Sequence, residues 1–220
     1  MMVRVMIMKN QYMYITSKEW FESSSLRNPL CVLDENIKSI YPEFFELNYD
    51  LKILVTKRPT NEEKLSYCYN DYRERYGSSD ISTVETAVKE SPSKNVLLNS
   101  FTQEHFEYIS PLIKDTAEIL YFFKCKRIND LSALSEFSNL KCVYIYGNNS
   151  LESLWDMSNN KELKVLSFVY ITKLKDIEAL KDSCVEYINF DTSDNFGNKK
   201  PILFDSNVFS TMRCLKYLKK

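Results

Sequence analysis

The chain has 220 residues, of which 44% are hydrophobic and 27% charged, as in an ordinary globular protein with one core or two small domains. Its 29 Lys and Arg nearly balance its 30 Asp and Glu, so the formal net charge is only -1. This balance gives no general attraction to nucleic acid or to anionic lipid, and it argues against both classes of partner.

The N-terminal region is predicted to cap the rest of the fold. Residues 3–8 are expected to form a strand, TSKEWFES (16–23) begins like a capped helix, and LKIL (51–54) is expected to form another strand. The first apolar run is interrupted by Arg4 and Lys9 and has no small-residue cleavage site, so no signal peptide is expected. We therefore interpret residues 1–57 as a capping region that includes one degenerate repeat.

Residues 58–94 are predicted to form an inserted, partly mobile segment of helix and loop. The pattern indicates a helix from Thr60 or Asn61 to Gly77 and a second, short helix that begins at Ser79 or Asp80. The first helix carries four tyrosines and two arginines, a combination that can stack on nucleic-acid bases. We expect these tyrosines to pack against their own domain, as alternate tyrosines on a helix usually do.

From residue 95 onward the sequence repeats itself with a step of 22 or 23 residues. Apolar residues three apart favour a tight return that is 3₁₀-like or irregular. They are Ile128, Leu131 and Leu134, then Leu151, Leu154 and Met157, then Leu174, Ile177 and Leu180. Alternating apolar residues predict one inward face of a strand; they are Ala117, Leu120 and Phe122, then Leu140, Val143 and Ile145, then Leu163, Leu166 and Phe168, then Val185, Ile188 and Phe190.

This pattern, including the fragment INDLSALSEFSNLK (128–141), resembles the leucine-rich repeat of the short internalin-like class. The resemblance covers residues 117–190, and NVLLNSF (95–101) and LKYL (215–218) extend it over 95–220. It implies an α/β fold, a right-handed curved solenoid with a parallel sheet on its concave face. Asn148 matches the asparagine that bonds backbone across the turn of this family, whereas Cys125 and Ile171 replace it, so those two turns are expected to be irregular.

Strand residues that alternate with the predicted core are expected to project from the concave face as an aromatic and apolar patch. Such patches mark binding surfaces, and Tyr is enriched among residues that dominate interfaces. The predicted binding residues are Ile119, Tyr121, Phe123, Tyr144, Tyr146, Val169, Tyr187, Asn189 and Asp191, accompanied by Cys142, Val165 and Ser167. An N-terminal segment or a second copy of the chain covering this face remains an alternative.

Motifs for catalysis are missing from the sequence. The single histidine, His105, is expected at the surface or half-buried without a role, and three glycines (77, 147 and 197) cannot build a phosphate-binding loop. The six cysteines contain no CxxC pair, which indicates reduced thiols in a cytoplasmic protein rather than a metal site. We therefore predict no catalytic residue, metal or cofactor.

The sequence thus favours a non-catalytic protein–protein interaction module that binds a protein or peptide on its concave face. It predicts no nucleic-acid or membrane partner, and it suggests self-association through the C-terminal edge strand LKYLKK (215–220). One alternative is an enzyme with its active site in residues 1–94 and the repeats as a docking arm, in which a cleft would gather His105 and several acids. Another is a structural subunit of an assembly whose repeats stack end to end.

Overall fold

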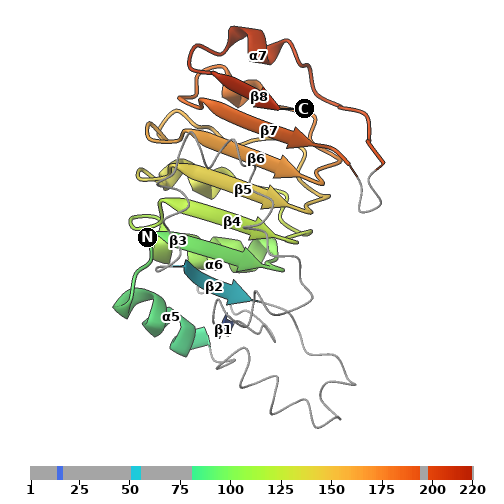
Figure 1. Ribbon diagram of the computed structural model, residues 1–220. Helices are drawn as coiled ribbons and strands as arrows, with labels where there is room; N and C mark the ends of the chain where they lie inside the picture. Colours follow the sequence, from blue (N-terminus) through green and yellow to red (C-terminus); the bar gives the residue numbers. More distant parts are fainter. Residues whose placement is uncertain (1–13, 17–50, 56–80, 194–197, 220) are drawn as a thin grey trace, which may run out of the picture.

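The structure, a computed structural model, describes residues 14–16, 51–55, 81–193 and 198–219. These residues form an α/β fold around one eight-stranded sheet whose strands lie in sequence order (Figure 1). Strand β1 (Tyr14–Thr16) runs antiparallel to β2 (Leu51–Val55), and every later pair of neighbours is parallel.

The six remaining strands keep one register across the sheet. They are β3 (Asn95–Asn99), β4 (Ile119–Phe123), β5 (Cys142–Tyr146), β6 (Val165–Val169), β7 (Tyr187–Asp191) and β8 (Tyr217–Lys219). The first residues of β3 to β7 follow one another at intervals of 24, 23, 23 and 22 residues and pair side by side. The structure therefore confirms the predicted strand register, including the strands expected in LKIL, NVLLNSF and LKYL.

The core lies on one face of this sheet. The inward residues of successive strands form continuous buried rows, such as Leu120, Val143, Leu166 and Ile188. All twelve alternating residues that the sequence assigned to the core belong to this cluster. One strand cannot bury its apolar side alone, so each repeat covers the core of its neighbour.

The returns between strands differ in kind. Two are short 3₁₀ helices, η4 (Ser132–Glu136) and η5 (Glu178–Leu180), as the three-residue spacing predicted. The return after β3 is instead an eleven-residue α-helix, α6 (Gln103–Ile113). Its N-cap Thr102 accepts a hydrogen bond from the backbone N–H of His105, and its buried face carries Phe106 and Ile109. The cap and this helical apolar stripe favour an α-helix here over a 3₁₀ return.

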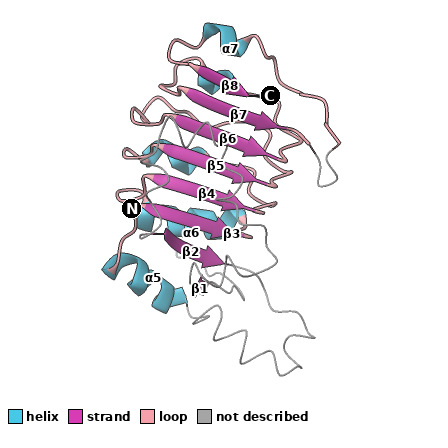
Figure 2. Cartoon of the chain, viewed as in Figure 1, coloured by secondary structure: helices cyan, strands magenta, loops and turns pink. Residues whose placement is uncertain are grey.

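Two further helices lie near the ends of the described sheet (Figure 2). Helix α5 (Ile81–Glu90) confirms the second of the two helices expected in 58–94, and α7 (Val208–Thr211) packs against η5. The strand expected at 3–8, the helix that begins within 16–23 and the helix expected between Thr60 and Gly77 lie outside the described residues. Within the described ranges, no helix is long and apolar enough to cross a membrane.

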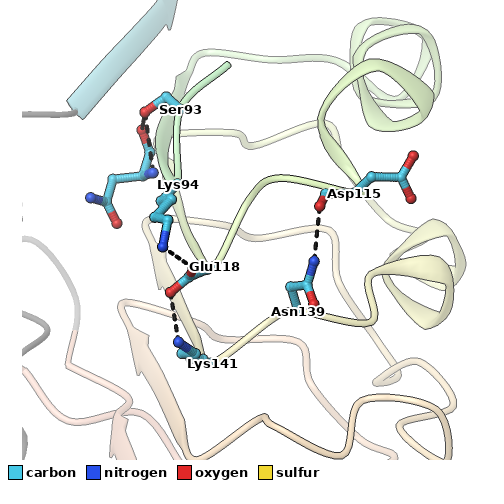
Figure 3. Close-up of polar contacts among 7 residues, drawn as sticks. Ser93, Lys94, Asp115, Glu118, Asn139 and Lys141 are labelled. Atoms are coloured by element: carbon cyan, nitrogen blue, oxygen red, sulfur yellow. Dashed lines mark hydrogen bonds and ion pairs between the residues drawn. The ribbon is translucent and has the colours of Figure 1, made fainter.

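Charged side chains at the strand entries form a second repeating feature (Figure 3). The Glu118 carboxylate lies 2.7 Å from the ammonium groups of both Lys94 and Lys141, the equivalent residues of the adjacent strands. Partial burial by itself raises the pKa of Glu118, but hydrogen bonds and charge from the two lysines outweigh it, so the pKa is lowered. Nearby, the Asn139 side-chain amide donates to the backbone carbonyl of Asp115 at 2.8 Å, which ties two adjacent repeats together.

Sharp turns at the strand ends rest on left-handed residues. Gly147 follows β5 with φ 70°, and Ser100, Lys124 and Tyr170 adopt the same region after β3, β4 and β6. At the turn after β5, Asn148 bonds the backbone of the neighbouring repeat as predicted. At the equivalent place Cys125 donates its thiol to the Leu98 carbonyl at 3.2 Å, so sulfur satisfies one backbone acceptor there. The backbone of this turn and of the turn at Ile171 is not irregular as expected, because the N–H groups of Lys124 and Tyr170 bond the next strand as that of Gly147 does.

Candidate functional site

The face of the sheet opposite the core carries the residues that the sequence singled out for binding, and we call it the aromatic face. Its members come from every second position of β3 to β7: Asn95, Leu97, Asn99, Ile119, Tyr121, Phe123, Cys142, Tyr144, Tyr146, Val165, Ser167, Val169, Tyr187, Asn189 and Asp191. The structure brings all nine predicted binding residues together on this face. Three members from β3 were not predicted, although the register of NVLLNSF contained the signal.

Aromatic side chains of neighbouring strands contact one another on this face, as the predicted columns require. The ring centroids of Tyr121 and Tyr144 lie 6.1 Å apart, and those of Phe123 and Tyr146 lie 5.1 Å apart with nearly parallel planes. Tyr170, in the turn after β6, places its ring edge-on to Tyr146 at 5.0 Å. The four predicted rings therefore form one continuous aromatic patch.

The burial of this patch differs from the exposed surface that the sequence predicted. Tyr121 is 2% exposed, Tyr144 0% and Tyr146 6%, and every predicted binding residue except Asp191 is buried. The expectation that these side chains form an exposed patch is therefore corrected, because they are buried in the structure.

The described helices do not account for this burial. Each of the helices α5, α6, η4, η5 and α7 contributes buried side chains to the core cluster on the opposite face of the sheet, among them Phe106, Leu134 and Phe209. The aromatic-face residues of β4 to β7 lie outside that cluster, although all of them except Asp191 are buried. The sheet thus carries buried apolar side chains on both of its faces.

The polar side chains on the aromatic face differ in whether they have a hydrogen-bond partner. The Tyr144 hydroxyl and the Asn95 side-chain oxygen are buried and make no hydrogen bond among the described residues. Asn189, by contrast, donates its amide to the Ser167 hydroxyl at 3.0 Å. Since burying an unpaired hydroxyl or amide is costly, these two atoms are places where a polypeptide on this face can supply a donor or an acceptor.

Toward β7 and β8 the aromatic face opens into a hollow of about 430 Å³. Three predicted binding residues line it: Val169, Asn189 and Asp191. The opposite wall brings lysines that the sequence did not single out, Lys199, Lys200 and Lys219, together with Ile202. The lysines come from a loop and from β8. No periodic pattern in the sequence indicated that they would lie at the same hollow.

Titratable groups on the covered part of this face are held neutral. Burial raises the pKa of the Tyr121 and Tyr144 hydroxyls far above the ordinary value, and neighbouring groups including Cys142 and Tyr146 add to the effect. Burial also raises the pKa of the Cys142 thiol to about 12. A thiol with this pKa carries almost no thiolate near neutral pH, so Cys142 is not a nucleophile.

His105, the residue on which a catalytic alternative depends, is buried rather than exposed or half-buried, which corrects the expectation. It lies on α6, where its Nδ1 is 2.7 Å from the Thr102 hydroxyl and its ring contacts Phe101. Burial lowers the pKa of His105 to about 4, although the charge of Glu104 acts in the opposite direction. Among the described residues, no group of three or more His, Cys, Asp or Glu side chains is placed to hold a metal ion.

No protein-family model matches this chain, and a search of curated proteins gives no match.

Proposed function

We propose that the chain is a non-catalytic protein-binding module, a leucine-rich-repeat solenoid whose aromatic face holds a segment of polypeptide. The observation that carries this proposal is the aromatic face, a layer of side chains that the core cluster does not use and that opens beside β7 into a hollow of about 430 Å³. Tyr121 and Tyr144 lie in one row of that layer, with Phe123 and Tyr146 in the next. Tyrosine side chains combine a large apolar ring with a polar tip, which suits contact with a peptide.

The hollow beside β7 is where we propose that a protein partner makes contact. Asp191 is only half-buried, and it shares the hollow with three lysines. Charges of both signs around an open space favour a polar rim next to the aromatic layer, as in protein–protein interfaces.

An enzymatic function has less support from the described residues. His105 lies on the core side of the sheet, on α6, whereas Asp191 and the hollow lie on the opposite face. A shared catalytic site of His105 and the acids near the hollow is therefore not formed. The alternative active site predicted in residues 1–94 falls mostly outside the described residues.

A charge reversal in the hollow tests the proposed function. The Asp191 carboxylate accepts a hydrogen bond from the Ser193 backbone N–H at 2.9 Å, and the Asp176 carboxylate makes the same turn contact with Glu178 at 2.9 Å. Asp176 does not line the hollow, so Asp176→Arg is a matched control for Asp191→Arg. Both variants lose one turn contact, and only one changes the proposed binding surface.

The readout is binding of partner proteins identified by affinity capture and mass spectrometry, then measured with each purified partner. We expect Asp191→Arg to weaken binding of a true partner by about tenfold or more, while Asp176→Arg binds like the wild type. Circular dichroism melting curves establish that both variants are folded. If every captured protein binds the two variants equally well, the hollow is not the contact site and this proposal is wrong.

A further inference from the structure

Exposed apolar side chains gather at one end of the sheet. Among the described residues, the large hydrophobic side chains classed as exposed are Ile202 (38%), Leu203 (49%), Tyr217 (44%) and Leu218 (38%). Two of these belong to β8, and Ile202 lines the adjoining hollow. Leu218 pairs in register with Ile188, which is 0% exposed, so Leu218 stands in a core row that one more strand would complete.

The backbone of β8 offers hydrogen-bonding groups at the same place. The Tyr217 N–H donates to the Glu186 carbonyl at 3.0 Å, which directs it toward β7. Because N–H and C=O groups of successive residues in a parallel strand point to opposite sides, those of Leu218 point away from β7. The described part of the sheet ends at β8, and no described strand pairs with this second edge. A strand edge of this kind is a template for pairing with another chain.

The charges around β8 favour an acidic partner. The segment 213–219 contains Arg213, Lys216 and Lys219 and no acidic residue. At the strand entries, the Glu186 carboxylate lies 3.3 Å from the Lys164 ammonium group and 2.7 Å from that of Lys216. The alternation of acid and base between neighbouring strands therefore ends on a lysine, and an acidic side chain on the next strand would continue it.

A second copy of this chain fits the edge less well. Two β8 strands paired antiparallel across a twofold axis would bring Lys216 and Lys219 of both copies into one short ladder. Like charges opposite each other destabilise strand pairing. Their repulsion opposes the gain from burying Tyr217 and Leu218.

We propose that the edge of β8 that pairs with no described strand binds an extended segment of another protein, in which apolar residues lie between acidic ones, as an added strand. The acidic residues pair with Lys216 and Lys219, and the apolar residues cover Tyr217 and Leu218. This site goes beyond the proposed function, because the backbone edge of β8 makes the contact, although one of its residues, Lys219, also lines the hollow.

Synthetic peptides test the proposal on the full chain. The probe is a labelled, end-capped peptide with the core Glu-Val-Leu-Glu, whose two acids face Lys216 and Lys219 in either strand direction. The matched control peptide has Lys in place of each Glu. We expect the acidic peptide to bind with a Kd below about 1 mM and at least about tenfold more tightly than the basic peptide.

N-methylation separates strand pairing from simple charge attraction. Two further acidic peptides carry methyl groups on alternate backbone amides, one in each of the two possible registers. Strand pairing needs only the amides that face β8. The peptide methylated on the other amides should therefore bind like the parent, whereas the peptide methylated on the amides that face β8 should bind about tenfold or more weakly. Equal binding of both methylated peptides would mean that no strand is added.

Two variants of the protein complete the test. Leu218→Pro removes the N–H that points away from β7, and edge strands tolerate proline. Leu218→Val keeps the N–H and an apolar side chain, so it is the matched control. We expect Leu218→Pro to bind the acidic peptide about tenfold more weakly and Leu218→Val to bind it normally.

Light scattering at the protein concentrations of these titrations completes the design. A monomeric wild type agrees with the proposal. A dimer of the wild type that Leu218→Pro converts to a monomer would show that a second copy occupies the edge, and the proposal would be wrong. Failure of the acidic peptide to bind below about 1 mM would also overturn it. Neither result bears on the Asp191 experiment, which concerns the aromatic face.

Discussion

Asn148 shows how one buried polar residue holds a turn. Its amide donates to the carbonyls of Cys125 at 2.9 Å and Ile128 at 2.7 Å, and its side-chain oxygen accepts from the N–H groups of Ser150 and Leu151. The side chain is 2% exposed and uses its hydrogen-bonding capacity fully. It therefore links the turn after β5 to the turn of the preceding repeat.

Replacing this residue tests its role. Asn148→Ala leaves several backbone groups unpaired in a buried place, so we expect the free energy of unfolding to fall by about 3 kcal/mol or more. The neighbouring Asn149 is exposed, and Asn149→Ala should change the free energy of unfolding by no more than about 0.5 kcal/mol. Urea denaturation of the three proteins measures both values. Equal losses in the two variants would contradict this account of the turn.

His105 is expected to make stability depend on pH. Burial lowers the pKa of His105 in the folded chain to about 4, compared with an ordinary value of 6.5. Below pH 6.5 the unfolded chain binds a proton that the folded chain does not, so the stability that His105 contributes is lost progressively between about pH 6.5 and pH 4. Above pH 6.5 this contribution is fully present.

Denaturation of the wild type and of His105→Phe across this pH range measures the effect. Because carboxylates titrate in both proteins, the difference between the two isolates the imidazole. We expect the wild type to lose stability relative to the variant as the pH falls from 7 to 4. His105 is the single histidine of the chain, so one imidazole NMR signal also reports its pKa directly. An ordinary pKa near 6.5 would show that the ring is hydrated.

At the scale of the strand, β5 places Tyr144 in the middle of the aromatic face. The ring is 0% exposed and contacts Tyr121, while its hydroxyl has no partner among the described residues. Truncation and removal of the hydroxyl should therefore have different consequences. Tyr144→Ser opens a large cavity and should cost about 3 kcal/mol or more. Tyr144→Phe removes an unpaired polar atom and should leave stability unchanged or raise it by about 1 kcal/mol.

Thermal or urea denaturation compares these two variants with the wild type. A small effect of Tyr144→Ser would restore the interpretation from sequence, in which this ring projects from an exposed face. A large loss in Tyr144→Phe would mean that the hydroxyl has a hydrogen-bond partner in solution.

The strands were predictable from the sequence because their information is local and repeated. Alternating residues such as Leu166 and Phe168 indicated which side of each strand faces the core, and the constant step fixed the parallel register. Helix α6 was not predicted, because Phe106 and Ile109 satisfy a three-residue spacing as well as a helical stripe, and the Thr102 cap decided between them.

The candidate site was predictable only in part, for a different physical reason. The alternation in each strand placed Tyr121 and Tyr144 correctly in one row, because successive side chains of a strand point to opposite faces of the sheet. Their burial was not predictable, since alternation gives the direction of a side chain and not what covers it. The lysines of the hollow were missed because Lys199 and Lys219 converge from separate segments.

At the scale of the whole molecule, stability depends on position along the stack of strands. Leu166 and Leu218 occupy the same core row, since Leu166 pairs with Ile188 and Ile188 with Leu218. Leu166 in β6 is covered from both sides and is 0% exposed, whereas Leu218 in β8 is 38% exposed. Each strand contacts mainly its sequence neighbours, so a defect in the middle disrupts two interfaces and a defect at the end disrupts one.

The same substitution at both positions tests this account of the stack. Leu166→Asp buries a charge without a partner at a cost of several kcal/mol, a large part of the roughly 5 to 15 kcal/mol that stabilise a typical domain. We therefore expect Leu166→Asp to lose its cooperative unfolding transition, as measured by circular dichroism. Leu218→Asp places its carboxylate near water and beside Lys216 and Lys219, and it should lower the free energy of unfolding by no more than about 1 kcal/mol. Equal and mild effects of the two substitutions would mean that Leu166 does not lie in a continuous core row.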